Sequence, residues 1–279
     1  MRTRISELNF FPNFSARKEY EKLNFLFCNR NAFQASPFAD HPNESYSFFQ
    51  LLDKYFLRWN LRGTFTSLNE MLDSLCISER YFDGSISDDR FLDYIQFILN
   101  AIEFVVQVYR RNNDIFCNDS MIEVTIKEQC ALLLDRFHAE VKKDHSELFV
   151  VYKNDAASAL SIQQPKLKIS IIDYLKIDNR DDLKRKSEIL CSLAKDLEPH
   201  EKSLERNGFR QLCSDTTLLL NVSGIRHDLN PQKKLEAKFL KMSEQDRIKW
   251  CDRTFQMILA CMAVLPYLDY KDEITSIKD

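Results

Sequence analysis

The chain has 279 residues, enough for one large domain or two smaller ones, each able to bury a core. Its four glycines stand apart at positions 63, 84, 208 and 224. This excludes a doubly wound dinucleotide-binding fold and a phosphate-binding glycine loop, because both need clustered glycines. The formal net charge of −3 argues against nucleic-acid binding over the whole surface, so any such contact must be local.

Helical periodicity dominates the first half of the chain, after a polar and aromatic lead-in over residues 1–44 that is expected to be irregular or partly helical. The pattern predicts helices at 44–60, 66–76, 88–111 and 121–136. In the second of them, Ser67 and Glu70 have the spacing of a capping box. The third is the most apolar, opens with acidic residues and closes with two arginines, as the helix dipole prefers. We therefore expect it to be central.

A single β-hairpin is predicted after these helices. Aromatic and β-branched residues around Val150 and Val151 favour strands, and the turn is expected between Lys143 and Ser146. The following stretch "AASALSIQQP", residues 156–165, is interpreted as a linker. The sequence thus predicts an N-terminal helical domain over 1–155 that ends in a small β-hairpin.

The second half of the chain predicts a C-terminal helical domain over 156–279. Its expected helices are 166–177, 181–197, 200–213, 215–225 and, after a basic loop, 243–265. Ser243 and Asp246 mark the start of the last helix, and Pro266 is expected to end it. The predicted fold class is mostly α, with helical bundles and one small two-stranded β-ribbon.

The cysteines and histidines give no support for a metal centre or a disulfide frame. The eight cysteines are scattered without a C-x-x-C pair, and the five histidines never pair at helical spacing. We expect free thiols in a reducing cytoplasm, no bound metal and no cofactor. The N-terminus lacks the apolar core of a secretory signal, and no uninterrupted apolar run approaches about 18 residues. No membrane association is therefore expected.

The run "DNRDDLKRKSE", residues 178–188, places acidic residues before Lys184, Arg185 and Lys186. This order is typical of a solvated helix start, which is our interpretation. The alternative is a role in binding phosphate. The 21 phenylalanines and 10 tyrosines alternate with aliphatic residues at helical spacing, so they are interpreted as core residues and not as base-stacking platforms.

One segment concentrates positive charge. Between Arg226 and Lys249 there are seven basic and four acidic residues, a local net charge of +3 in a chain that is −3 overall. We call residues 226–249 the basic segment. It is the part of the sequence where a polyanion such as RNA is expected to dock.

The stretches "NGFRQLCSDTTLLLNVSGIRHDLN" and "DRTFQMILACMAVLPYL" resemble the HEPN superfamily as found in bacterial abortive-infection proteins. The start "MRTRISELNFF" and the stretch "LLLDRFHAEVKKDHSELFVVYKND" resemble the N-terminal domain that accompanies this unit. The resemblance implies helical bundles, a role in antiphage defence or toxin–antitoxin biology, and, in active members, metal-independent RNA cleavage by a dimer. It also implies a homodimer or a complex with a co-encoded defence protein.

The nuclease motif of that family is an arginine, a polar residue, and a histidine five to seven positions after the arginine. Arg226 matches the arginine and His227 takes the adjacent polar position, so the resemblance implies these two as catalytic residues. The spaced histidine position falls on Pro231, Gln232 or Lys233, a departure from the family pattern. The candidate RNA-binding residues around the pair are Asn221, Ser223, Lys233, Lys234 and Lys238.

Three interpretations of Arg226 and His227 stay open. Neighbouring residues on a helix point about 100° apart, so the two side chains converge on one phosphate only if Gly224 loosens the backbone or the helix ends before Pro231. The histidine would then act as general base or acid toward a ribose 2′-hydroxyl, and the arginine would stabilise the charged transition state. In a structural role, Arg226 caps carbonyls at a helix C-terminus and His227 hydrogen-bonds a neighbouring helix.

The third interpretation is non-catalytic binding of RNA or of a partner protein. Two functions therefore follow from the sequence. One is a metal-independent endoribonuclease effector. The other is a non-catalytic HEPN-like module that senses, inhibits or scaffolds a partner of a defence system.

Overall fold

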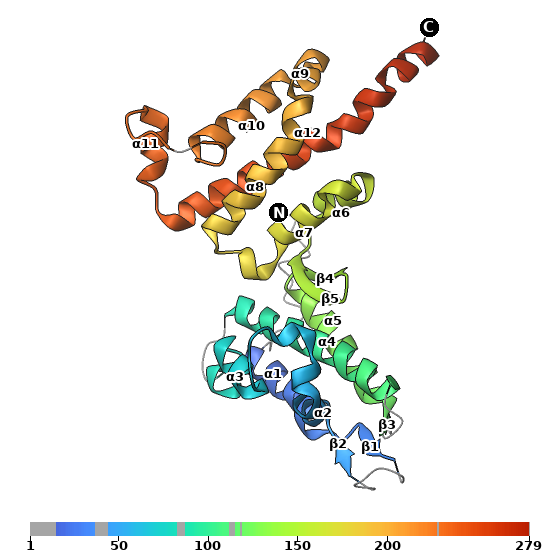
Figure 1. The fold of residues 1–279 in the computed structure, drawn as a ribbon. Coiled ribbons are helices and arrows are strands. Elements are labelled where there is room, and N and C mark those ends of the chain that lie inside the picture. Colours follow the sequence, from blue (N-terminus) through green and yellow to red (C-terminus); the bar gives the residue numbers. More distant parts are fainter. Residues whose placement is uncertain are drawn as a thin grey trace, which may run out of the picture. The chain divides into compact units, whose positions relative to one another are not determined.

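The computed structural model describes residues 15–36, 44–82, 87–111, 115–117, 119–227 and 229–278. The chain divides into two compact units, Met1–Val150 (unit 1) and Val151–Asp279 (unit 2). This division lies close to the boundary expected at 155/156. The described residues are mostly helical, which confirms the predicted fold class (Figure 1). The first 14 residues of the expected lead-in lie outside the described part.

Unit 1 is built around one long helix. Its helices are α1 (Ala16–Asn24), α2 (Phe48–Tyr55), α3 (Leu68–Ser74), α4 (Asp88–Arg111) and α5 (Ser120–Arg136). Short π and 3₁₀ segments cover Phe25–Asn29, Phe56–Arg58, Asn60–Arg62 and Glu79–Phe82. The helices predicted at 88–111 and 121–136 are confirmed. At α3, Ser67 accepts from Glu70 N as expected, but the Glu70 carboxylate accepts from Thr66 N instead of closing the capping box on Ser67.

α4 forms the core of unit 1, as its apolar surface predicts. Half of its residues are buried, and they pack against aromatic side chains such as Phe27 and Trp59. Its buried Asn100 exchanges two hydrogen bonds with the backbone of Leu148, at 2.7 and 2.8 Å. Among the described residues, α4 is the one helix long and apolar enough to cross a membrane, and 67% of its most apolar window is buried within the fold. Such burial is typical of a core helix.

The strands differ from the prediction in one respect. The expected hairpin is confirmed as β4 (Ala139–Asp144) and β5 (Glu147–Tyr152). A second, three-stranded antiparallel sheet in the order β2-β1-β3 was not expected; its strands are β1 (Phe33–Ala35), β2 (Ser45–Tyr46) and β3 (Ile115–Cys117). The prediction of a single ribbon was wrong, because strands of two or three residues are too short to give a period-two pattern.

Unit 2 is a helical bundle. Its helices are α6 (Asp155–Gln163), α7 (Lys168–Leu175), α8 (Leu183–Leu197), α9 (Glu201–Leu204), α10 (Arg210–Val222), α11 (Lys234–Leu240) and α12 (Glu244–Lys278). Short 3₁₀ and π segments cover Pro165–Leu167, Ile177–Asn179, Glu198–His200 and Glu205–Phe209. α12 packs along α8, and α6 and α10 also contact α12 (Figure 1).

The predicted linker over 156–165 was wrong. Most of that stretch belongs to α6, whose first turn is capped by Asn154 accepting from Ala157 N at 3.0 Å. Ala157 and Leu160 are buried in the bundle. The expected break between helices at 213–215 was also wrong, because the chain bends at Gly208, which has a φ of +95°.

The predicted helix end at Pro266 was wrong as well. α12 continues to Lys278 with Pro266 inside it. A proline leaves the carbonyl four residues earlier without its helical donor. Here that carbonyl belongs to Met262 and accepts from the Gln164 side chain at 3.1 Å. The side chain of Gln164 thus replaces the hydrogen bond that Pro266 cannot make.

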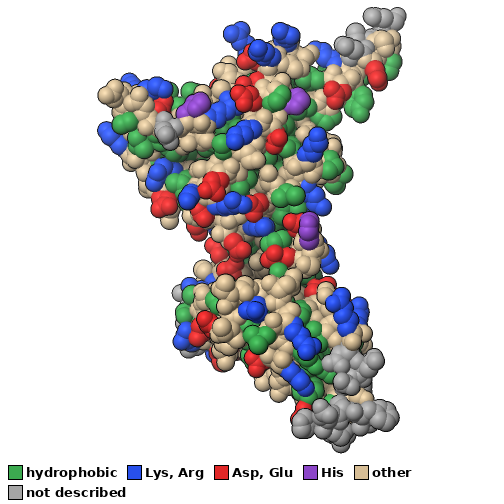
Figure 2. All heavy atoms as spheres, in the orientation of Figure 1, with side chains coloured by type: hydrophobic (Ala, Val, Ile, Leu, Met, Phe, Trp, Pro, Cys, Tyr) green, Lys and Arg blue, Asp and Glu red, His purple; other side chains and the backbone are tan. Residues whose placement is uncertain are grey.

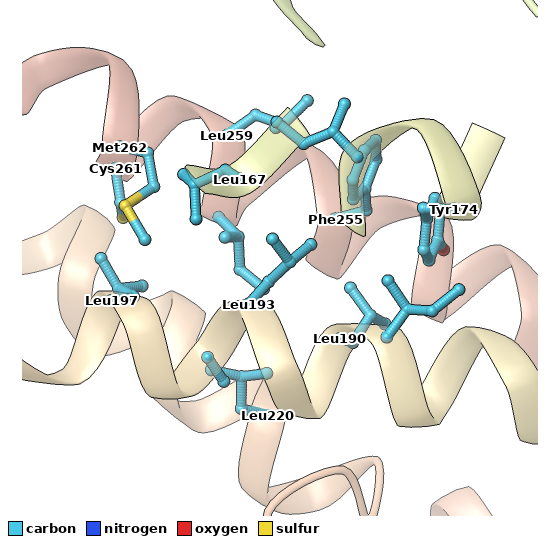
Figure 3. Close-up of a cluster of buried hydrophobic side chains, with 14 of the residues drawn as sticks. Leu167, Tyr174, Leu190, Leu193, Leu197, Leu220, Phe255, Leu259, Cys261 and Met262 are labelled. Carbon is cyan, nitrogen blue, oxygen red and sulfur yellow. The ribbon is translucent and has the colours of Figure 1, made fainter. Parts of the chain in front are cut away.

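The core of unit 2 lies between α8 and α12. Leu190, Leu193 and Leu197 of α8 are buried against Phe255 and Leu259 of α12 (Figure 3). The helix start around 178–188 is only partly solvated, since Lys186 is 4% exposed. The interpretation of Lys186 as a solvated side chain was therefore wrong.

Candidate functional site

The passage around Gly224 is a helix C-terminus. Gly224 has a φ of +75°, its N–H donates to Asn221 O at 3.4 Å, and Ile225 N–H donates to Leu220 O at 3.2 Å. These two hydrogen bonds form a Schellman motif. In this motif the residues joined by the bond that spans more of the chain are commonly apolar and in contact. Ile225 and Leu220 are both buried in the core of unit 2. The helix therefore ends at Val222, and Arg226 and His227 are not helical.

Arg226 is held by a carboxylate. Its Nη2 lies 2.6 Å from Glu201 Oε1, and the two side chains are 16% and 23% exposed. The Thr217 hydroxyl donates to the same oxygen at 3.3 Å. The partner of the guanidinium is thus an acidic side chain of α9 and not the helix carbonyls that we expected. This ion pair connects the chain just after α10 to α9.

His227 is exposed at the surface of the loop after α10. Within the described part of the chain its ring has no hydrogen-bond partner, so the expected bond to a neighbouring helix is not present. The imidazole of His227 does interact electrostatically with the carboxyl group of Glu236. The pKa of that carboxyl is lowered mainly by the N–H of Asn230, then by Lys233, with a smaller contribution from His227.

The five candidate RNA-binding residues fall into two groups. Asn221, Ser223 and Lys233 are not available to a ligand in the same way: Asn221 Oδ1 is buried and has no hydrogen-bond partner among the described residues, Ser223 Oγ donates to Leu219 O at 2.6 Å, and Lys233 Nζ pairs with Glu236 at 3.0 Å. Lys234 and Lys238 are exposed on α11. The structure therefore presents to solvent, without an ion pair among the described residues, only two of the five.

α11 was missed because its residues were interpreted as a basic loop. Glu236, in its first turn, accepts from Asn230 N at 2.5 Å and fixes the preceding loop. Leu235, Phe239 and Met242 follow the i, i+4, i+7 spacing of one helical stripe. That spacing is a sequence signal that could have revealed the helix.

An apolar groove of about 200 Å³ lies between the end of α10, α11 and α12. Its walls include Leu218, Val222, Leu235, Phe239, Met242 and Trp250. Leu218 and Leu235 are 48% and 56% exposed, so the groove presents apolar side chains to solvent. The groove is the feature that sequence reasoning did not anticipate.

Positive charge borders this groove. Lys238 lines it, and Lys234 and Lys241 lie one turn before and after Lys238 on the same face of α11. Figure 2 shows Lys and Arg side chains interspersed with Asp and Glu over the visible face. A uniformly basic surface of the kind that holds a nucleic-acid backbone is not seen on that face.

The described residues form neither a metal-binding cluster nor a disulfide. No group of three or more His, Cys, Asp or Glu residues that could hold a metal ion exists in the described part of the chain. The eight cysteines are free. Burial raises the pKa of Cys28 and Cys130 to about 12, which disfavours a reactive thiolate at these two positions.

Comparisons with protein-family models, with curated proteins and with solved structures find no match to this chain.

Proposed function

We propose that the chain is a HEPN-like protein of bacterial phage defence, acting in the cytoplasm, whose unit 2 is a non-catalytic module that binds a co-encoded protein. The carrying observation is the apolar groove between α10, α11 and α12, bordered by lysines. The groove fits an amphipathic helix that carries acidic residues beside its apolar face.

The size of the groove supports a protein partner. Small-molecule pockets usually measure about 300–1,000 Å³, whereas this groove measures about 200 Å³. A volume of this size suits one or two anchoring side chains of a partner. The lysine stripe beside the apolar stripe on α11 adds electrostatic complementarity to acidic residues, which speeds association and fixes orientation.

The state of Arg226 also favours this proposal over catalysis. A guanidinium already paired to Glu201 at 2.6 Å must lose that partner before it stabilises a phosphorane. No spaced histidine follows it at 231–233. The arrangement is better suited to stabilising the end of α10, and thereby one wall of the groove.

The test is co-purification of the full chain with the product of the adjacent gene. Leu235→Ser and Lys238→Glu should each reduce the complex about tenfold or more, since one alters the apolar wall and the other reverses a charge on it. Ile162→Ser is the matched control, because Ile162 is an 80% exposed apolar residue of α6 outside the groove. Equal recovery of partner with all three variants would reject the groove as the binding surface.

A metal-independent endoribonuclease remains the second candidate, and one observation favours it. His227 is exposed beside Arg226 on the loop that precedes the lysines of α11. In that function a dimer would bring two such loops to one RNA. The measurement that separates the two candidates is RNA cleavage by the wild-type chain and by His227→Ala.

A further inference from the structure

The C-terminal end of α12 presents a second apolar surface on unit 2. Tyr267, Tyr270, Ile274 and Ile277 are between 40% and 84% exposed. Their spacing of i, i+3, i+7 and i+10 places them on one face of the helix. We call these four residues the tail stripe. The red end of α12, which carries them, extends beyond α8 (Figure 1).

The fold holds the tail stripe toward solvent. Leu268 packs against the core of unit 2, and Lys271 Nζ donates to Asn207 Oδ1 at 2.9 Å. At about 100° per residue, Leu268 lies on the opposite side of the helix from Ile277. Packing on one side of α12 therefore fixes the apolar stripe on the other side. An apolar stripe presented in this way is typical of an interaction surface.

Acidic residues border the tail stripe. Glu273 lies one helical turn before Ile277, and Asp269 lies one turn before Glu273. Both acidic side chains are exposed, and neither has an ion pair among the described residues. The end of α12 thus has the pattern of an amphipathic helix that carries acids beside its apolar face.

The groove between α10, α11 and α12 has the complementary pattern. Leu235 and Lys238 line it from α11, three positions apart on the same side of that helix. Lys238 has no ion pair within the described part of the chain. The apolar wall suits the side chains of the tail stripe, and the lysine suits Asp269 or Glu273. Polarity and charge therefore match between two surfaces of the same chain.

The tail stripe cannot fill the groove of its own chain. Trp250 and Thr254 line the groove from the first turns of α12, and Tyr267 follows Thr254 by 13 positions in the same helix. At 1.5 Å per residue the two surfaces are about 20 Å apart along the helix axis. Since α12 is continuous between them, the groove is reached only by the α12 end of another molecule.

We propose that a second copy of this chain inserts its tail stripe into the groove and competes there with the co-encoded protein. This inference rests on the proposed function and adds what occupies the groove when that protein is absent. Each copy has one groove and one tail stripe, so mutual insertion closes a two-fold dimer. One contact with a groove of about 200 Å³ is small for a stable interface, and the closed dimer has two.

This contact differs from a dimer formed around Arg226 and His227, because neither residue lines the groove. It also places the lysines of α11 against acidic side chains of the second copy. A dimer in which two basic segments faced each other would instead set like charges together.

The test is sedimentation velocity of the full chain over a range of concentrations. We expect a reversible dimer that dissociates on dilution. Ile274→Ser in the tail stripe and Leu235→Ser in the groove should each lower the association constant about tenfold or more, because each removes an apolar anchor. Ile162→Ser, an exposed apolar residue outside both surfaces, should leave it unchanged. A monomer at every concentration, or a dimer that all three variants leave equally strong, would overturn the proposal.

A charge exchange tests the pairing itself. Glu273→Lys and Lys238→Glu should each weaken the dimer, because like charges then meet at the contact. Both substitutions in one chain should recover part of the lost affinity, a gain that damage to the fold cannot produce. A double variant no stronger than the weaker single variant would contradict the pairing.

Recovery of the co-encoded protein separates this inference from the proposed function. Ile274→Ser frees an intact groove, so its recovery of that protein should rise, whereas Leu235→Ser should lose both contacts. A monomeric wild-type chain that still binds the protein through Leu235 would overturn this inference alone. A chain that dimerises as expected but recovers no co-encoded protein would contradict the proposed function alone.

Discussion

Two basic stretches of unit 2 behave differently in the fold. Residues 178–188 contribute Lys186, which is buried in a cavity beside Tyr174 and Asp252. The basic segment, 226–249, is the richer of the two in charge, yet none of its basic residues is buried. Arg226, Lys233 and Lys249 of that segment are each paired with a carboxylate.

The difference shows that charge density along a chain does not predict which basic residue the fold buries. In the basic segment, acidic residues three positions away compensate Lys233 and Lys249, as neighbours on a helical turn can. Lys186 is instead paired with Asp252, which lies 66 positions later in the sequence. Its partner is supplied by convergence in space and not by local composition.

The largest effect on stability is expected from removing the aromatic side chain of Phe255, because it belongs to the core of unit 2 and also lines the cavity. Phe255 is 1% exposed and stacked on Tyr174, so Phe255→Ala should lower the free energy of unfolding by about 3–5 kcal/mol. Trp250→Ala, in the same helix but half-buried in the wall of the groove, should cost less. Urea denaturation of both variants measures the difference. Equal losses would contradict a distinction between a core-supported cavity and a surface groove.

The second-largest loss of stability is expected from a substitution at Gly224, just before the basic segment. At Gly224, with a φ of +75°, an added Cβ would lie 2.9 Å from Leu229 Cγ. Gly224→Ala should therefore cost about 2–3 kcal/mol, from backbone strain and overpacking together. Gly208→Ala is the control, since its φ is also positive but nothing lies within 4 Å of its added Cβ. Thermal unfolding in which Gly208→Ala loses as much stability would show that the Leu229 contact adds nothing.

A smaller effect is expected at Arg226. The Arg226–Glu201 pair is mostly shielded from solvent, so Arg226→Ala should cost about 1–2 kcal/mol, and a double-mutant cycle with Glu201→Gln should give a favourable coupling energy. The pair Lys249–Asp246, with side chains 66% and 55% exposed, should show a coupling of about 0.5 kcal/mol or less. Indistinguishable couplings would mean that Arg226 is held no more firmly than a surface lysine.

The sequence predicted the regular elements of unit 1 well. α4 and α5 have charged ends, β4 alternates along its six residues, and β5 carries an aromatic and β-branched run. The three-stranded sheet and the π segments have no comparable periodicity. α6 and the continuation of α12 depend on Asn154 and on Gln164, whose side-chain bonds only the fold reveals.

The sequence predicted where the candidate site lies along the chain, but not which side chains contact one another there. Gly224 does end the helix before Arg226, as the sequence allowed. Glu201, the partner of Arg226, lies 25 positions earlier, and no local pattern connects the two. The cavity is still less accessible to sequence reasoning, because Lys186 and Asp252 are 66 positions apart.

Substitution of His227 should have the smallest effect on stability. The same variant distinguishes between a catalytic and a structural role of the basic segment. Its side chain is exposed, so His227→Ala should change the free energy of unfolding by no more than about 0.5 kcal/mol. If the segment only supports the groove, wild type and variant should both leave RNA intact at high protein concentration, with and without chelator. If His227 transfers a proton, wild type should cleave RNA in the presence of chelator and the variant should be slower by about 10²–10⁴-fold. Cleavage assays beside denaturation curves separate these outcomes, because an unchanged stability leaves loss of chemistry as the one explanation of a loss of rate.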